Sequence, residues 1–141
     1  MKRQVIHTAT DLVEATYRPE LNAVYVKWFS EYDEGTRVRD AVYAALDFVR
    51  ANEIQHWVVD VTTSPDGLSD DDYDWVSGDD FQSAIENSPL RKFVLLPPLP
   101  ESGQDDAWVA DWEANTLAKF GNGIRAKVCN TIEEVKAFLA T

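Results

Sequence analysis

The stretch that decides the fold reads IQHWVVDVTTSPDGLSDDDYDW and runs from Ile54 to Trp75. Its first eight residues, 54–61, form a nearly unbroken apolar run, which is typical of a central parallel strand covered on both faces. The segment 62–68 contains Pro and Gly, which favour a loop, and Ser69 opens an acidic segment that favours a helix start. This order indicates a strand–loop–helix unit of an open α/β sheet, and ligands of such sheets usually bind beside this junction.

Upstream of this unit, the sequence predicts a β meander followed by a helix. The segments 12–17 and 24–29 read as strands, and the intervening segment 18–22 holds the turn formers Pro and Asn. Residues 4–7 favour a short additional edge strand. Thr36 is a candidate N-cap, because apolar residues at helical spacing follow it and predict a helix with one buried face.

Downstream, the acidic segment predicts a helix from Ser69 to about residue 87. In this helix Asp72 takes the place of the usual Glu of a capping box, and Gly78 marks an expected break. Residues 92–97 are apolar after Lys92, which predicts a second buried strand that ends at a Pro pair.

The last part of the chain predicts two helices around one more strand. Ser102 and Asp105 repeat the capping pattern and predict a helix that starts there, and the segment 124–129 alternates as a strand does. Thr131 and Glu134 form a full capping box for the closing helix. The whole order predicts a single α/β domain, 1–141, with a mixed sheet: an N-terminal antiparallel hairpin, then parallel strands, flanked by helices.

The net charge of the chain is concentrated in its middle. The 141 residues carry a formal net charge of −12, and residues 51–90 contain ten Asp or Glu but no Lys or Arg. Such a field repels phosphate backbones and anionic lipids, so nucleic-acid binding is excluded and a basic protein surface or cationic ligand fits better. Solubility alone is the alternative explanation.

The remaining bulk features favour a cytoplasmic protein without membrane insertion. Cys129 is the only cysteine, so no disulfide forms within one chain. A lone thiol is compatible with a reducing cytosol. The N-terminal residues lack the long apolar stretch of a signal peptide, and no apolar run approaches the length that spans a membrane. Homo-oligomer formation stays open at this level.

Several segments together resemble a known superfamily. They are the hairpin Pro19–Asn22 with Val24–Trp28, the strands Trp57–Asp60 and Phe93–Pro97, the segment Leu68–Trp75, and the closing segment Thr131–Leu139. In these, the chain resembles the STAS-like domains related to bacterial anti-sigma-factor antagonists. It resembles more closely a little-characterised branch described alongside CRAL-TRIO lipid-binding domains. The resemblance covers nearly the whole chain and concerns architecture more than chemistry.

In antagonist STAS domains, phosphorylation of a Ser at the helix start after a central strand acts as a switch. The serines in the corresponding region here are Ser64 and Ser69, and neither has the Ser–Gly neighbourhood of that motif. A phosphate on Ser69 would face Asp70, Asp71 and Asp72, and like-charge repulsion opposes it. Ser69 is therefore predicted to act as an N-cap.

Other site chemistries find little support in the sequence. Asp70, Asp72 and Asp74 have the alternate spacing of a calcium loop, but the Gly and Glu that such a loop needs at its sixth and twelfth positions are missing. His7 and His56 have no Cys or His at zinc-ligand spacing. No Ser or Cys has a local base to activate it. We expect a non-enzymatic chain without metal or cofactor; the alternatives are a loose divalent-ion site on these Asp side chains and an enzyme that uses Asp60 or nearby carboxylates as acid or base.

Two kinds of binding surface remain as hypotheses. Asp60, near the end of the central strand, either caps the following loop or points into a site. An acidic edge would bind a basic protein partner, and an aromatic cleft at the carboxyl ends of the parallel strands would instead bind a small apolar or lipid-like ligand. The candidate binding residues for both are Asp60, Asp66, Ser69, Asp70, Asp71, Tyr73, Trp75, Trp108 and Trp112, with Asp105 on the acidic rim of the cleft.

Overall fold

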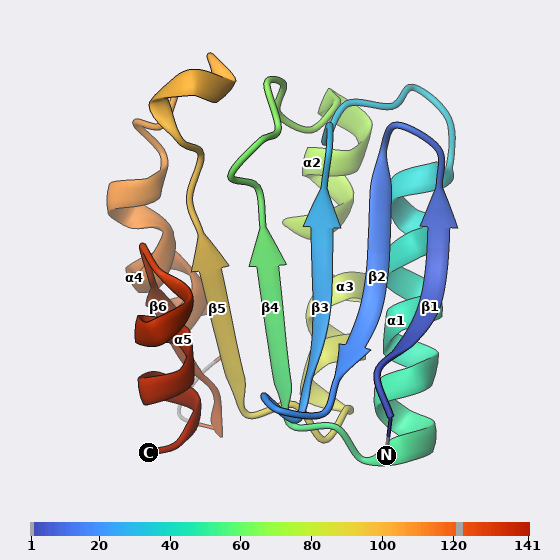
Figure 1. The fold of residues 1–141 in the computed structure, drawn as a ribbon. Helices are drawn as coiled ribbons and strands as arrows, with labels where there is room; N and C mark the ends of the chain where they lie inside the picture. The colour runs from blue at the N-terminus through green and yellow to red at the C-terminus, as the bar shows by residue number, and fades with distance from the viewer. Residues whose placement is uncertain (1, 121–122) are drawn as a thin grey trace.

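A computed structural model describes residues 2–120 and 123–141 and places six strands in one sheet (Figure 1). The strands lie side by side in the order in which they occur along the chain. They are β1 (Gln4–Ala9), β2 (Val13–Arg18), β3 (Ala23–Trp28), β4 (His56–Asp60), β5 (Lys92–Leu96) and β6 (Arg125–Val128).

The sheet is mixed, as the sequence predicted. β1, β2 and β3 pair antiparallel, and β3 to β6 pair parallel. The segment 4–7, predicted as an edge strand, lies within β1 at one edge, and β6 forms the other edge. β4 occupies a central position with parallel neighbours on both sides, which agrees with the mainly apolar run that predicted it.

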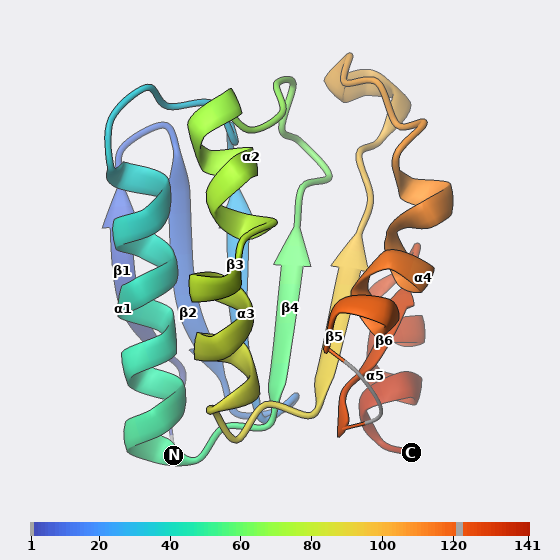
Figure 2. The same ribbon diagram turned by 180° about the vertical axis from the view of Figure 1, so that it is seen from behind.

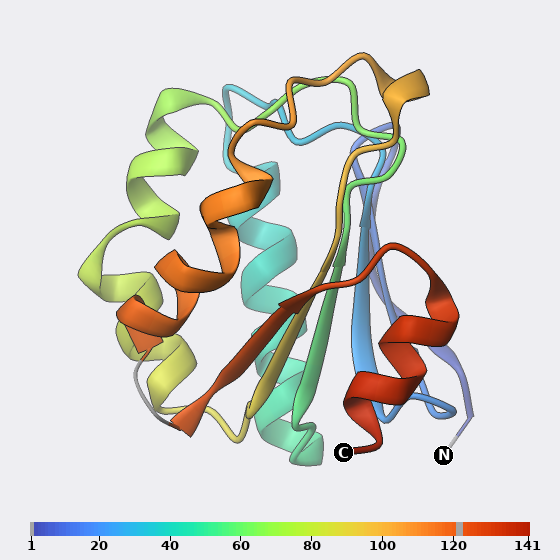
Figure 3. The ribbon, with the colours of Figure 1, turned by 90° about the vertical axis from the view of Figure 1, so that its left-hand side faces the viewer.

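The helices divide unequally between the two faces of the sheet. Figure 3 views the sheet edge-on and shows α1, α2, α3 and α4 on one side and α5 on the other. Figure 2 shows the four-helix side, where α1 lies over β1 and β2. The helices are α1 (Arg37–Asn52), α2 (Asp70–Val76), α3 (Asp79–Glu86), α4 (Val109–Phe120) and α5 (Ile132–Leu139), and a 3₁₀ turn, η1, spans Pro100–Ser102.

Alternation along the strands sends side chains into two separate cores. On the four-helix side, Val24, Val26 and Trp57 pack against the buried stripe of α1, which includes Val42 and Leu46. On the other side, the strands pack against α5 in a smaller core formed by Leu21, Ala23, Tyr25, Val58, Val94, Leu96, Cys129, Val135, Phe138 and Leu139. The central strands are therefore buried on both faces.

The helix termini test the predicted capping residues. Ser69 caps α2, because its Oγ accepts a hydrogen bond from the Asp72 N–H at 3.2 Å. The acidic helix breaks at Gly78, as predicted, into α2 and α3. Thr131 caps α5 in the same manner through the Glu134 N–H. Thr36 occupies the predicted N-cap position of α1, but its hydroxyl donates to Asp40 Oδ2 and makes no cap bond.

The predicted helix start at Ser102 and Asp105 is wrong. Pro100 to Ser102 form the 3₁₀ turn, and α4 begins only at Val109. Ser102 Oγ accepts from the Gln104 N–H, and Asp105 Oδ1 accepts from the Ala107 N–H. Both side chains thus bond to backbone two residues ahead, as Ser and Asp do in turns, and they stabilise a loop instead of a helix.

No helix in the described part of the chain has the length and the apolar character needed to cross a membrane.

Candidate functional site

Three loops meet at the carboxyl edge of the parallel strands, at the top of the molecule in Figure 1. They follow β3, β4 and β5 and span residues 29–36, 61–69 and 97–108. They contain no Lys or Arg, and we call them together the acidic rim. Its carboxylates are Glu31, Asp33, Glu34, Asp66, Glu101, Asp105 and Asp106.

The acidic rim also exposes apolar side chains. Seven large hydrophobic residues are exposed among those that the structure describes, and four of them lie in these loops. A fifth, Tyr73, is 62% exposed on α2, which starts directly after the second loop. The four in the loops are Phe29, Tyr32, Leu99 and Trp108. Exposed aromatic groups inside a charged border are typical of protein-binding surfaces.

A partly buried hydrogen-bond cluster holds the three loops together. Ser64, which is fully buried, accepts from the Glu31 N–H at 3.1 Å, and its hydroxyl lies 3.2 Å from Glu31 Oε2 and 2.9 Å from the Asp66 carbonyl oxygen. Gln104 Nε2 donates to Glu31 Oε2 at 3.0 Å and to the Ser64 carbonyl at 2.7 Å. Trp108 Nε1 donates in turn to Gln104 Oε1 at 3.3 Å. Each of the three loops contributes one member of the Glu31–Ser64–Gln104 cluster.

The Glu31 carboxyl group has a strongly shifted pKa. Burial is the main cause and raises it, the hydrogen bonds from Gln104 and Ser64 oppose the shift, and the resulting pKa is about 7. The Ser64 hydroxyl has a single proton and two acceptors, Glu31 Oε2 and the carbonyl oxygen of Asp66, so it cannot donate to both at once. This competition also favours a proton on Glu31. The cluster thus gains or loses a proton near neutral pH.

Asp60 caps the loop that follows β4. Its Oδ1 accepts from the Thr62 N–H at 2.9 Å and from the Thr62 hydroxyl at 2.6 Å. Its Oδ2 accepts from the Tyr25 hydroxyl at 2.5 Å and lies 3.6 Å from Lys27 Nζ. Burial raises the pKa of Asp60, but the hydrogen bonds from Thr62 and Tyr25 and the charge of Lys27 outweigh it and lower the pKa. Of the two predicted roles, the structure shows loop capping.

Asp72 differs from its acidic neighbours because it lies inside the fold. Its carboxylate is fully buried, and Oδ1 pairs with Arg39 Nε of α1 at 3.1 Å. Its Oδ2 has no hydrogen-bond partner among the described residues. Ser69 is also buried and engaged in the N-cap, so its hydroxyl is not displayed to solvent as a phosphorylation site would be.

The remaining predicted site residues fall into two groups. Asp66, Asp70, Asp71, Asp105 and Tyr73 are exposed, and they lie in the acidic rim or at the start of α2.

The tryptophans are placed differently. Trp75 is partly buried, with its ring centroid 5.3 Å from that of Tyr43 and 5.2 Å from that of Phe81. Trp112 also packs against the larger core, whereas Trp108 is 38% exposed just before α4.

Sequence reasoning missed four rim residues, namely Glu31, Tyr32, Leu99 and Gln104. A usable signal existed, because each of them follows a predicted parallel strand, and the carboxyl ends of parallel strands meet at one edge of the sheet. Most candidates came from the loop after β4, since it alone leads into a dense run of Asp, and the loop after β5 contributed only Asp105 and Trp108. The burial of Glu31 had no sequence signal.

The strand topology does not by itself create the aromatic cleft that the sequence predicted at this edge. The strands follow one another in sequence order, and the helices that connect the parallel strands lie on one face. Because the loops after β3, β4 and β5 all lead to helices on the same face, no crevice opens at these three strands between loops that diverge to opposite faces. The two surface pockets that we describe lie elsewhere, one at the edge of β6 and one beside the β2–β3 turn.

Comparison of the chain with protein-family models, with curated proteins and with solved structures found no match.

Proposed function

We propose that this chain is a STAS-like, non-enzymatic interaction module that binds a basic surface of a protein partner through its acidic rim. The observation that carries the proposal is the coincidence of two features at one edge. Three loops without a single Lys or Arg also display Phe29, Tyr32, Leu99 and Trp108, beside the exposed Tyr73. Carboxylates steer a basic partner, and aromatic anchors supply most of the contact energy.

The burial of two candidate nucleophiles, Ser64 and Cys129, supports a binding role over an enzymatic one. Ser64 is fully buried and hydrogen-bonded within the cluster. The Cys129 thiol is buried in the core under α5, and burial is the main cause that raises its pKa. A thiol of raised pKa in an apolar core is a poor nucleophile.

The Glu31–Ser64–Gln104 cluster supports the same proposal, because it fixes the shape of the surface. Three loops that are joined by partly buried hydrogen bonds keep their relative positions before a partner arrives. A pre-organised surface loses less conformational entropy on binding than separate mobile loops would.

The test is site-specific photo-crosslinking in an extract of the source cells. A photoreactive amino acid replaces Tyr73 in one variant and Val5 in a control variant, and both positions are 62% exposed. We expect Tyr73 to capture a discrete basic protein and Val5 to capture none. Capture should fall in high salt, because salt screens charges beyond about 10 Å at 0.1 M.

A matched pair of charge variants identifies the surface responsible. Asp70→Asn with Asp71→Asn removes two exposed charges beside the acidic rim. Asp79→Asn with Asp80→Asn removes two exposed charges at the start of α3. The first pair should reduce capture much more than the second. Equal losses, or a crosslink that is indifferent to salt, would overturn the proposal.

A further inference from the structure

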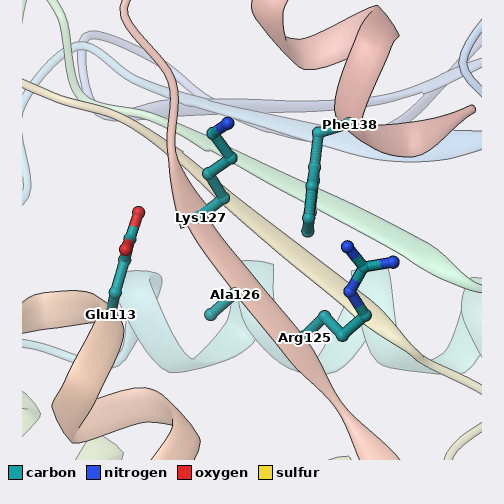
Figure 4. A pocket seen from close by; sticks show the side chains of 5 residues that line it. All are labelled: Glu113, Arg125, Ala126, Lys127 and Phe138. Atoms are coloured by element: carbon teal, nitrogen blue, oxygen red, sulfur yellow. The ribbon is translucent and has the colours of Figure 1, made fainter. Parts of the chain in front are cut away.

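The free edge of the sheet at β6 has the opposite charge character to the acidic rim. Arg125 and Lys127 are exposed on this strand, in a chain whose net charge is −12. A surface pocket of about 380 Å³ lies along the strand, lined by Glu113, Arg125, Ala126, Lys127 and Phe138. Figure 4 shows Glu113 on one side of β6, and Arg125 and Phe138 together on the other.

The backbone of β6 directs hydrogen-bonding groups outward. The N–H groups of Arg125 and Cys129 point to β5, where they donate to the carbonyls of Arg91 and Leu95. Strand alternation therefore turns the N–H and C=O groups of Ala126 and Val128 away from β5. Among the described residues, Glu113 alone bonds to this outer side.

Glu113 makes that bond in the position that a neighbouring strand would use. Its Oε1 accepts from the Val128 N–H at 2.5 Å, so a carboxylate from α4 replaces a strand carbonyl. Natural sheets protect unpaired edges with such charged side chains. The Glu113 carboxylate occupies one backbone donor, the Val128 N–H. It leaves the outward N–H and C=O groups of Ala126 for pairing with another strand.

The side chains of β6 show which partner fits. Ala126 and Val128 pack toward the larger core, whereas Arg125 and Lys127 lie on the opposite face. There the Arg125 guanidinium carbon is 5.1 Å from the centre of the Phe138 ring. A strand added at this edge would place alternate side chains beside both cations.

We propose that the β6 edge binds an extended acidic segment of a protein partner, which adds to the sheet as a seventh strand. Main-chain hydrogen bonds to Ala126 and Val128 hold the segment, and its alternate carboxylates pair with Arg125 and Lys127. The proposal concerns a different surface from the acidic rim and does not depend on it. A second copy of this chain fits poorly, because antiparallel pairing of two β6 strands would set these cations against each other.

The probe for the test is a fluorescein-labelled, capped hexapeptide of alternating Glu and Thr, measured by fluorescence anisotropy with the whole chain at 150 mM salt. We expect binding that saturates below about 1 mM peptide. Two control peptides separate the contributions. Alternating Lys and Thr reverses the charge, and N-methylation of the Thr amides removes main-chain donors without changing the charge. The N-methylated peptide should bind at least about five-fold more weakly than the unmodified acidic peptide.

Three variants of the chain complete the design. Lys127→Glu should weaken binding about ten-fold, and Lys136→Glu, the same charge change at an exposed site of α5, should weaken it much less. Glu113→Ala frees the Val128 N–H from its hydrogen bond and removes a negative charge, so it should increase the affinity for the acidic peptide. In this variant, added peptide should also slow hydrogen exchange at the Ala126 amide.

Three results would overturn the proposal. One is no saturable binding at millimolar peptide. Another is equal affinity for the acidic and N-methylated peptides, which would mean charge attraction without strand addition. The third is a dimer in sedimentation that Lys127→Glu disrupts, because the occupant of the edge would then be a second copy.

Discussion

Replacing Glu31 with glutamine is expected to stabilise the chain above neutral pH. The pKa of this carboxyl group is raised from its ordinary value of 4.5 to about 7, mainly by burial. The folded state therefore holds the proton more tightly than the unfolded state does. Between pH 4.5 and 7 the folded chain binds more protons, so the contribution of Glu31 to stability is complete below about pH 4.5 and is lost as the pH rises through 7.

The size of the effect follows from the two pKa values. Each unit of pKa difference corresponds to about 1.4 kcal/mol, so the full loss is roughly 3 kcal/mol. The side chain is only partly buried, and water weakens the effect, so we expect about 1 to 3 kcal/mol. Glutamine keeps the shape of protonated Glu31. Its amide oxygen, placed where Oε2 of Glu31 lies, can accept from both Gln104 and the Ser64 hydroxyl, so the contacts of the cluster can persist without a charge.

The assay is urea unfolding followed by tryptophan fluorescence, at intervals from pH 4.5 to 8.5. The free energy of unfolding of Glu31→Gln should match that of the parent chain at the acid end and exceed it progressively above pH 5. Glu101→Gln removes the same charge from an exposed site in the acidic rim and serves as the control. A difference that does not change with pH, or a variant less stable than the parent at pH 8, would refute the reasoning.

Three further substitutions test other contacts. Arg39→Ala leaves the fully buried Asp72 carboxylate unpaired and should cost about 3 to 5 kcal/mol in urea unfolding. Arg37→Ala breaks an exposed pair and should cost less than about 1 kcal/mol, and similar costs for the two would contradict the buried-pair argument. Ser69→Ala removes the α2 cap and should lower the free energy of unfolding by about 1 kcal/mol, whereas Ser69→Gly should lower it by only a few tenths. An unchanged free energy of unfolding in the alanine variant would show that this cap does not stabilise the fold. Lys92→Met removes the ammonium group that donates to the carbonyls of Phe138, Leu139 and Thr141. Amide hydrogen exchange in α5 should therefore accelerate. Unchanged exchange in α5 would show that packing alone holds the helix.

Periodicity and capping residues were enough to predict most of the fold. The mainly apolar run 54–61 predicted a central strand, and β4 lies between two parallel neighbours with a core on each face. Ser69, Gly78 and Thr131 marked real helix boundaries, because their effects are local and depend on nearby backbone groups.

Local signals failed where the same residues have two uses. Ser102 and Asp105 form an acceptable capping pattern, yet both side chains bond to backbone only two residues ahead and shape a loop. Ser and Asp favour helix caps and turns for the same reason, which is their ability to accept a hydrogen bond from a nearby N–H. Their sequence spacing alone cannot choose between the two.

The candidate surfaces depended on the tertiary structure. The sequence by itself determined the acidic charge, the strand order in the chain and the type of each element, since these follow from composition and local spacing. Only folding brought Glu31, Ser64 and Gln104 from three loops into one partly buried cluster, and only the loss of solvent around Glu31 raised its pKa. Tertiary contacts likewise separated Asp72 from the exposed Asp70 and Asp71, and placed Glu113 of α4 against the free edge of β6. Burial and pairing across long sequence separations are properties of the packed chain, and no local pattern encodes them.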